Sequence, residues 1–402
     1  MESFSFADLF SGGGGMSHGF HAHPRFTVKG AADAQLGKPS SGRGSLSCNS
    51  TYELNMNLKP VEVDLSAVAP SDLRSAWGLK GRLDVLSACP PCTGFSRAMP
   101  TNHLVNDDRN SLVTRTALFV EEFRPRVLVM ENAREMLSGN FAHHFDGLRE
   151  ALEGLGYTIH AERHILTRFG LPQIRERALV VAVAPGEKMR TMDDLWDGWE
   201  VTPEAITVGR AIRGLPAVRA GEQHPDDPAH VSPRFEAAES LARIQAIPHD
   251  GGSWRDLWEN ESSRHLLTPA MMRSAHASRW GSHADVYGRL SWDRPAPTVK
   301  RECGHIGNGR YAHPEQDRLL TVREMGMISG FPRSYLFGGN SLSNRYRHIG
   351  DAVPPLVSHQ IAWLTHWILT GTRPLPQQTV LPGCQLRAED LHPTKSTVAA
   401  AA

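Results

Sequence analysis

The start of the chain constrains the fold most, because it reads as a short strand, a glycine run and a helix. Phe4 to Phe10 is predicted to be a buried strand, Ser11 and Gly12 to Gly15 follow, and Met16 to His21 begins a helix. This order forms the front of a nucleotide-binding βαβ unit, since glycine lets the backbone approach a ligand without a Cβ. Glycine runs also make plain turns, and no P-loop lysine follows, so the ligand need not carry phosphate.

Acidic residues end the next two predicted strands. Phe26 to Ala32 is apolar and is followed by Asp33, about 20 residues after the glycines, where a ribose hydroxyl is often held. Val61 to Leu65 contains Asp64. Either acid could simply be a solvated strand end. Together with the glycine turn, however, two acids suit a neutral or cationic nucleoside better than a dinucleotide.

A cysteine follows the fourth predicted strand. Leu83 to Leu86 is expected to be buried and to end near Ser87, and Pro90 and Pro91 then stiffen the backbone before Cys92. Since strand carboxyl ends face the ligand crevice in open α/β sheets, Cys92 is a candidate nucleophile. The alternative is a small core residue.

Cys92 also forms a C-x-x-C pair with Cys89. Zinc needs about four ligands, and the remaining cysteines are isolated, so no metal site is expected. The two prolines, followed by Thr93 and Gly94, open a loop rather than the helix that a thioredoxin-like motif would open. Disulfide exchange is therefore also not expected.

Further helices and strands alternate up to about residue 185. Leu112 to Phe123 has an apolar helical face, Val127 to Met130 is a buried strand leading into Glu131, and Phe141 to Leu155 is a helix. Glutamate is rarely buried without a partner, so Glu131 at the end of a core strand indicates a crevice position. Tyr157 to Ile165 and Ala178 to Val183 are predicted to pair. Just before the second of these, Arg175 and Arg177 would point to one face of extended chain.

Composition narrows the class of protein. The chain has 402 residues, 40% of them hydrophobic and 21% charged, with 43 basic and 43 acidic residues. These values are typical of a globular protein and argue against a generally basic nucleic-acid binder. The sequence lacks an apolar run long enough to span a bilayer, and five scattered cysteines favour a reducing cytoplasm.

Charge is distributed unevenly in the middle of the chain. Residues 188–261 carry 8 Lys/Arg and 14 Asp/Glu, whereas residues 262–323 carry 10 and 5. The second half is therefore predicted to face phosphates, and the acidic half to face solvent. A plain solvated face is the alternative for both.

The order of these parts resembles the DNA cytosine-5 methyltransferase family. The stretches that carry the resemblance are FADLFSGGGGMSHGF, VDLS, SACPPCTGFS, VMENA, FGLPQIRERALVV, RLSWDRPAPTV and RHIGDAVPP, in family order over about residues 4–185 and 287–370. It implies a Rossmann-like, mostly parallel α/β domain that uses S-adenosyl-L-methionine, with a smaller target-recognition domain inserted before a C-terminal helix. The expected boundaries are 1–185, 186–343 and 344–371, with a disordered tail over 372–402.

The resemblance assigns roles to individual residues. Cys92 would attack C6 of cytosine, Glu131 would hold N3 and the exocyclic amine, Arg177 would contact O2, and Arg175 would hold the catalytic groups and a phosphate. The Pro90 carbonyl would read the amine. Asp33 would contact the ribose and Asp64 the adenine; further cofactor contacts are expected from Phe10, Ser11, Gly12, Gly14, Leu65, Pro90, Leu112 and Asp351. DNA contacts are expected from Pro91, Ser96, Gln173, Arg264, Arg273, Arg279, Lys300, Arg301 and Arg310, with Thr93 to Asp107 as a lid.

Two positions depart from the family pattern. Asp351 stands where the family usually has Asn, and it can accept a hydrogen bond from the ammonium of the cofactor's methionine but cannot donate to its carboxylate. Ala133 stands where Val is usual, which is a small packing change.

The resemblance implies double-stranded DNA as the partner, a monomer, and an enzyme of class EC 2.1.1.37. A cognate restriction endonuclease acting on the same site is a possible second partner. Two alternatives stay open: an RNA cytosine-5 methyltransferase on the same scaffold, and a catalytically silent DNA-binding protein. A recognition lobe of about 100 residues favours DNA, and the presence of both Cys92 and Glu131 argues against the silent protein.

Overall fold

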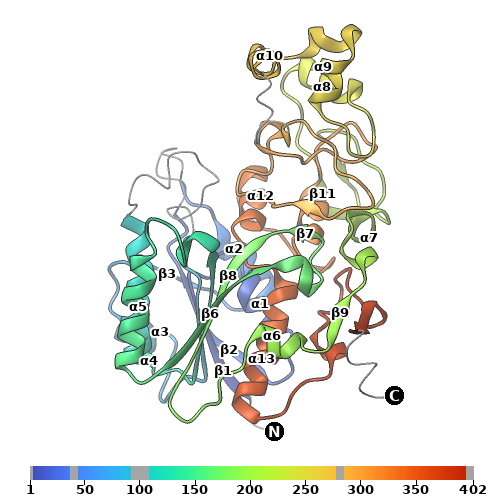
Figure 1. Cartoon of the computed structure of the whole chain (residues 1–402). Helices are drawn as coiled ribbons and strands as arrows, with labels where there is room; N and C mark the ends of the chain where they lie inside the picture. Colours follow the sequence, from blue (N-terminus) through green and yellow to red (C-terminus); the bar gives the residue numbers. More distant parts are fainter. Residues whose placement is uncertain (1–2, 37–43, 92–107, 278–284, 395–402) are drawn as a thin grey trace.

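The computed structural model describes residues 3–36, 44–91, 108–277 and 285–394, and its centre is a mixed seven-stranded sheet (Figure 1). The strand order is β3-β2-β1-β4-β5-β8-β6. The five neighbours β3, β2, β1, β4 and β5 pair in parallel, in that order. Strand β8 pairs antiparallel with both β5 and β6. The strands are β1 (Phe4–Leu9), β2 (Phe26–Asp33), β3 (Val61–Glu62), β4 (Val85–Ala88), β5 (Val127–Ala133), β6 (Thr158–Ile165) and β8 (Glu176–Val183). The predicted mostly parallel α/β architecture is confirmed.

Helices cover both faces of this sheet (Figure 1). On one face lie α3 (Pro70–Ala76), α4 (Ser111–Phe123) and α5 (His143–Gly154); on the other lie α1 (Gly15–His21), α6 (Met192–Trp196) and α13 (Pro355–Thr370). Strand side chains alternate between the two faces, so Val127 and Val129 pack toward α1 and α13 while Leu128 and Met130 pack toward α4 and α5. The sheet is therefore buried on both sides.

The predicted helices of this domain are confirmed. Leu112, Thr116, Phe119 and Phe123 are all buried along α4. The stripe Val357, Ile361, Leu364 and Ile368 is buried along α13, which packs on α1 as expected for a returning helix. Strand β3 is shorter than predicted, because the chain turns at Asp64, whose carboxylate accepts a hydrogen bond from the Ser66 N–H (2.8 Å).

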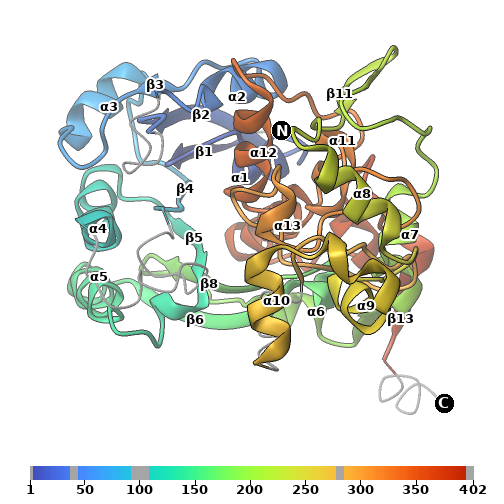
Figure 2. The same cartoon turned by 90° about the horizontal axis from the view of Figure 1, so that it is seen from above.

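A second lobe rises from one end of the sheet (Figures 1 and 2). Its core contains Trp254, Leu290, Tyr311, Leu320 and Tyr346. Its elements are α7 (Val208–Ile212), β10 (Gln223–His224), β11 (Asp227–Val231), α8 (Ala238–Ala246), α9 (Trp254–Glu259), α10 (Pro269–His276), α11 (Val322–Ile328) and α12 (Leu342–Gly350). Residues of α2 (Cys48–Met56), from the first half of the chain, also pack into this core. After α6 the chain passes from the sheet domain into the second lobe. Ala205 still packs with the sheet, and Val208 is the first residue after it that packs in the core of the lobe.

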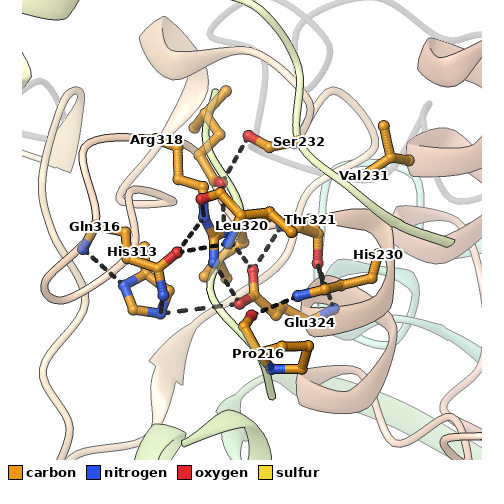
Figure 3. Close-up of polar contacts among 12 residues, drawn as sticks. Pro216, His230, Val231, Ser232, His313, Gln316, Arg318, Leu320, Thr321 and Glu324 are labelled. Atoms are coloured by element: carbon orange, nitrogen blue, oxygen red, sulfur yellow. Dashed lines mark hydrogen bonds and ion pairs between the residues drawn. The ribbon is translucent and has the colours of Figure 1, made fainter. Parts of the chain in front are cut away.

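Buried charges hold the centre of this lobe together (Figure 3). Arg318 and Glu324 are fully buried and form two hydrogen bonds, at 2.6 and 2.8 Å. Glu324 also accepts from the Thr321 N–H, and His230 contacts the Thr321 hydroxyl at 2.9 Å. These contacts tie α11 to β11 and to the loop before α11, so the lobe has one defined arrangement around a polar centre.

The expectation of a disordered tail is wrong for residues 372–394. Leu381, Leu386 and Leu391 are buried among residues of the sheet domain, and β13 (Leu391–Pro393) pairs antiparallel with β9 (Trp199–Val201). Pro376 begins a 3₁₀ turn in this segment (Pro376–Thr379), because its fixed φ suits the first position of such a turn. We call residues 372–394 the C-terminal strap; residues 395–402 lie outside the described part of the chain.

No helix among the described residues is long and apolar enough to cross a membrane.

Candidate active site

The glycine turn after β1 is fixed by Asp33 at the end of β2. One carboxylate oxygen of Asp33 accepts from the Gly12 N–H (2.9 Å), and the other accepts from the Gln35 N–H (2.6 Å) and from the Cys48 thiol (3.4 Å). Gly12 has a φ of +51°, and open space surrounds the position that a Cβ would take. The backbone of the turn is therefore open to an approaching ligand at Gly12, and Asp33 holds the turn in place.

The far side of the turn packs against the segment between α12 and α13. A Cβ on Gly15 would lie 2.2 Å from the carbonyl oxygen of Val353, and a Cβ on Gly13 would lie 3.3 Å from the Thr51 side chain. Tyr335 donates a hydrogen bond to the Gly13 carbonyl. Asp351, two residues before Val353, thus lies beside the same turn although it is more than 300 residues away in the sequence.

The other predicted cofactor residues differ in exposure and in backbone conformation. Phe10 is half-buried with a φ of +60°, and Ser11 is buried with a hydroxyl that has no hydrogen-bond partner among the described residues. Gly14 has a φ of +90°, while Leu65 and Leu112 are buried and Asp64 is exposed. An unpartnered hydroxyl, an open glycine and two carboxylates fit a nucleoside that carries a positive charge.

The candidate catalytic carboxylate is the side chain of Glu131, within β5. Its oxygen Oε1 lies 2.8 Å from Nε of Arg177 and 3.9 Å from Nη2 of Arg175, and only 8% of the side chain is exposed. The antiparallel register of β5 and β8 pairs Ala133 with Arg177, which brings the arginine alongside the carboxylate. Glu131 is therefore buried beside two arginines, and its position in a ligand crevice stays a prediction.

Arg175 links the two lobes. It is 3% exposed, and its guanidinium donates to the carbonyl oxygens of Val299 (3.3 Å) and Ala352 (3.1 Å). It therefore joins the hairpin that carries Arg177 to the second lobe and to the segment beside the glycine turn. Arg177 is more exposed, and its Nη1 donates to the Glu176 carbonyl (2.8 Å).

The strand before the candidate nucleophile is held against Glu131. The Cys89 thiol accepts from the Glu131 N–H (3.3 Å), and Asn132 donates through Nδ2 to the Pro90 carbonyl (3.0 Å). Burial raises the pKa of the Cys89 thiol well above its ordinary value, which argues against a thiolate there. Pro91 is exposed, whereas Cys92, Ser96 and the predicted lid over 93–107 lie outside the described residues.

Two residues predicted to contact DNA are used inside the protein instead. Gln173 is fully buried; its amide donates to the Ser329 hydroxyl and accepts from the Val299 N–H. Arg310 donates to the carbonyls of Gly251, Gly252 and Arg289. Both expectations are corrected, because the donors and acceptors that they required are already occupied.

The remaining predicted DNA contacts differ in their surroundings. Arg264, Arg273 and Lys300 are exposed. Arg264 also donates a hydrogen bond to the Trp258 carbonyl, and its guanidinium lies over the Trp258 ring. Arg301 forms an ion pair with Asp351. Arg279 lies outside the described residues.

Sequence reasoning missed the roles of Asn132 and of the Arg301–Asp351 pair. Asn132 stands directly after Glu131, so its place in the same strand end was a usable signal. Arg301 and Asp351 are 50 residues apart, and only their three-dimensional arrangement reveals their contact.

Solved structures with this fold are methyltransferases. A putative DNA modification methyltransferase encoded within an Escherichia coli prophage matches with a TM-score of 0.61, over 91% of this chain and 99% of that chain, at 21% identity. The Schizosaccharomyces pombe Dnmt2 methyltransferase matches with a TM-score of 0.52, over 91% and 99%, at 17% identity. At such identities the likeness shows the fold alone.

The sequence itself defines the family. The model of the family described as "C-5 cytosine-specific DNA methylase" matches residues 4–364. The chain therefore belongs to this family, in the class of DNA (cytosine-5-)-methyltransferases. The type II methylase M.HgiDII of Herpetosiphon aurantiacus is 32% identical over 88% of this chain and 93% of its own length. The type II methyltransferase M.Eco47II of Escherichia coli is 28% identical over 89% and 78%. Members of the family use S-adenosyl-L-methionine.

Proposed function

We propose that the chain methylates C5 of a cytosine within a defined site in double-stranded DNA, through a covalent bond between Cys92 and C6. The observation that carries this proposal is the Glu131 carboxylate, buried against Arg177 and Arg175 at the strand end whose Asn132 binds the Pro90 carbonyl. This arrangement offers a cytosine an acid group and a guanidinium at the carboxyl end of the parallel strands, and Cys92 follows Pro90 by two residues in the sequence. The site-specific type II relatives support a defined target sequence.

The proposed chemistry makes C5 nucleophilic by adding the thiolate to C6. The thiolate electron pair forms the S–C6 bond, and the displaced ring electrons reach C5 while Glu131 holds the N3 side of the ring and stabilises its charge. Arg177 binds O2 and fixes the Glu131 carboxylate. After C5 gains the methyl group, a water molecule takes the C5 proton; the electrons of that C–H bond re-form the C5–C6 double bond, and the thiolate leaves C6 with the electrons of the S–C6 bond. Because these atoms are inaccessible inside a duplex, the cytosine must be flipped out.

The open side of the glycine turn is the proposed site for S-adenosyl-L-methionine. When bound, this group supplies an electrophilic methyl attached to a sulfonium. Asp33 and the open backbone at Gly12 would face the ribose, Asp64 the adenine, and Asp351 the methionine end. The Ser11 hydroxyl lacks a partner among the described residues and is available as a further contact.

DNA recognition is proposed to lie in the second lobe. Arg264, Arg273 and Lys300 are exposed there and can reach phosphates or guanine edges, whereas Arg310 is removed from this set. Monomeric action, and a cognate endonuclease that cleaves the same site, remain proposals drawn from the restriction-modification relatives.

A methylation assay that compares duplex DNA with transfer RNA tests the substrate class. We expect methyl incorporation into duplex DNA alone, and bisulfite sequencing should find it at one short sequence. Incorporation into transfer RNA alone would favour the RNA enzyme, and incorporation into neither would favour the silent binder.

Covalent trapping tests the mechanism. Duplex DNA with 5-fluorocytosine at the target should trap the protein, because fluorine cannot leave C5 as a proton does, and mass spectrometry should find the adduct on the peptide that contains Cys92. Cys92→Ser should abolish methyl transfer and keep DNA binding. Cys89→Ser should stay active as the matched control, and an adduct on Cys89 would contradict the assignment.

A further inference from the structure

A histidine and two carboxylates meet at one edge of the sheet, outside the candidate active site. His160, Glu162 and His164 alternate along β6, the last strand of the sheet, so their side chains lie on the same face of it. Ile159 and Ala161, which alternate with them, pack toward α4 and α5 on the opposite face. The first three side chains therefore point toward the layer that contains α6 (Figure 1).

Asp193, in the first turn of α6, completes the group. Thr191 and Asp194 close a capping box at the start of this helix, which fixes the backbone at Asp193. Oδ1 of Asp193 lies 3.9 Å from Nδ1 of His164, and Oε2 of Glu162 lies 3.8 Å from Nε2 of the same ring. One ligand atom from each of these three residues lies within 4.8 Å of the other two.

These separations are close to those that a single metal ion requires. Bonds from zinc to nitrogen and oxygen are about 2.0–2.2 Å long, so two ligands of one ion lie at most about 4.4 Å apart. Small rotations of the Glu162 and Asp193 side chains would bring both carboxylates and one ring nitrogen of His164 onto the same ion.

The His164 ring is buried and packed, but its nitrogens form no hydrogen bond with any of the described residues. Only 5% of the side chain is exposed, and the ring packs against Phe169 with 5.2 Å between the ring centroids. The distances to the two carboxylates, 3.8 and 3.9 Å, are too long for hydrogen bonds. A buried polar ring without a partner costs free energy, and an ion held by both carboxylates would supply that partner.

The two carboxylates are accessible to an ion and are only weakly neutralised. The side chains of Glu162 and Asp193 are 42% and 41% exposed. Arg168 donates to Asp193 at 2.5 Å from an exposed position, and His160 contacts Glu162 at 3.2 Å. Because ion pairs at the surface contribute little, a divalent cation can displace Arg168 from Asp193.

We propose that Glu162, His164 and Asp193 bind one zinc ion or a similar divalent transition metal, with water completing its coordination. A nitrogen ligand beside two carboxylates suits zinc, whereas Ca²⁺ and Mg²⁺ prefer oxygen ligands alone. The ion would tie β6 to α6. It would also lie beside the strand that carries Arg177, since His164 pairs with Arg177 in the antiparallel register of β6 and β8. From the sequence, only the cysteines were considered as metal ligands. The site does not depend on the proposed function.

Zinc titration of the whole chain, freed of metal, tests the site. Calorimetry should find one zinc ion per chain with a micromolar dissociation constant. Glu162→Gln, Asp193→Asn and His164→Asn should each weaken binding by at least about 10- to 100-fold, because even loss of a group that only holds a metal ligand costs this much. The two carboxylates are partly exposed, so their variants should fold as the wild type does. His143→Asn changes an exposed histidine on α5 and should bind zinc as the wild type does.

Arg168→Met gives a readout that a merely structural cluster would not produce. Since Arg168 competes with the ion for Asp193, its removal should raise the affinity for zinc by up to about 5-fold, the factor that corresponds to a surface ion pair. Arg163→Met is the matched control, because Arg163 is an exposed charge on the opposite face of the same strand. It should leave the affinity unchanged.

Two results would overturn the inference. One is a wild-type protein that binds zinc no more tightly than millimolar; the other is tight binding that survives all three ligand substitutions, which would place the ion on other histidines. Methylation of duplex DNA by the metal-free protein is measured separately, so the proposed function can stand after either result.

Discussion

Asp8, the last residue but one of β1, is a buried acid just before the glycine turn. Its carboxyl accepts from the Ser17 hydroxyl (2.6 Å), which in turn accepts from the Tyr52 hydroxyl (2.8 Å). Burial raises the pKa of Asp8 to about 7, and the hydrogen bond from Ser17 only partly opposes this effect. The group is thus neutral in the folded protein at a pH where an unfolded chain would ionise it.

The Asp8→Asn variant should therefore become more stable relative to the wild type as pH rises. A raised folded-state pKa means that the folded wild-type protein binds more protons than the unfolded chain between about pH 4 and 7, so its stability falls as pH rises through this window. Asparagine keeps the acceptor and removes the titration. The free energies of unfolding of the two proteins are measured with urea at pH 5 and pH 8. Relative to the wild type, the free energy of unfolding of the variant should increase by about 2–3 kcal/mol between the two pH values. A constant difference between the proteins would contradict the neutral carboxyl.

At the scale of elements, the start of α11 depends on one buried ion pair. Glu324 closes a capping box with Thr321 and also binds Arg318 through two hydrogen bonds. Burial alone would raise the pKa of Glu324, but the hydrogen bonds from Arg318 lower it to about 2. The carboxylate therefore contributes stability above about pH 4.5, and this contribution is lost as pH falls through about 2.

Glu324→Gln should destabilise the protein by about 3–5 kcal/mol at pH 7, because it leaves the Arg318 charge buried without an anion. The measurement is the urea unfolding midpoint of the second lobe, followed by the fluorescence of its tryptophans. Glu259→Gln is the control: Glu259 pairs with Arg255 on the exposed face of α9, where such a pair is worth about 0.5 kcal/mol or less. Equal effects from the two substitutions would show that the buried pair stabilises no more than an exposed one.

The sequence allowed the elements of the sheet domain to be predicted better than their polar contacts. The apolar stripe of α13 and the short buried strands follow from local periodicity, which needs no knowledge of distant residues. Gln173 and Arg310 were placed on the DNA because their residue types suit it. Their actual partners, Ser329 for Gln173 and Gly252 for Arg310, are distant in the sequence and become neighbours only in the folded chain. The ordered structure of the strap was not predicted, because its buried leucines recur without helical or strand spacing.

At the scale of the whole molecule, the C-terminal strap connects both lobes to the hairpin that carries Arg175. Gln385 donates to the Gly170 carbonyl (2.7 Å), Leu386 packs where a Cβ on Gly170 would lie at 2.7 Å, and Asp390 pairs with Arg210 at 3.1 Å. Gly170 begins the turn into the segment that contains Gln173 and Arg175. The strap therefore supports the base of the candidate active site from behind.

Truncation after Gly371 should lower both stability and methyl transfer. It exposes the core around Leu381, Leu386 and Leu391, and the loss of even one buried leucine typically costs about 2–5 kcal/mol. Thermal unfolding and a methylation assay on duplex DNA would measure the two effects. Truncation after Thr394 removes none of these contacts and should leave both unchanged; an active, stable protein that ends at Gly371 would exclude a supporting role for the strap.

The pairing of Arg210 with Asp390 also bears on how the second lobe can be exchanged between relatives. Arg210 belongs to the first helix of the second lobe, whereas Asp390 lies beyond the helix that completes the sheet domain. A chimera that transplants only residues 208–350 would separate the two halves of this contact and leave a buried acid without its cation. New sequence specificity should therefore be inherited intact only when the lobe and residues 372–394 are taken from the same parent.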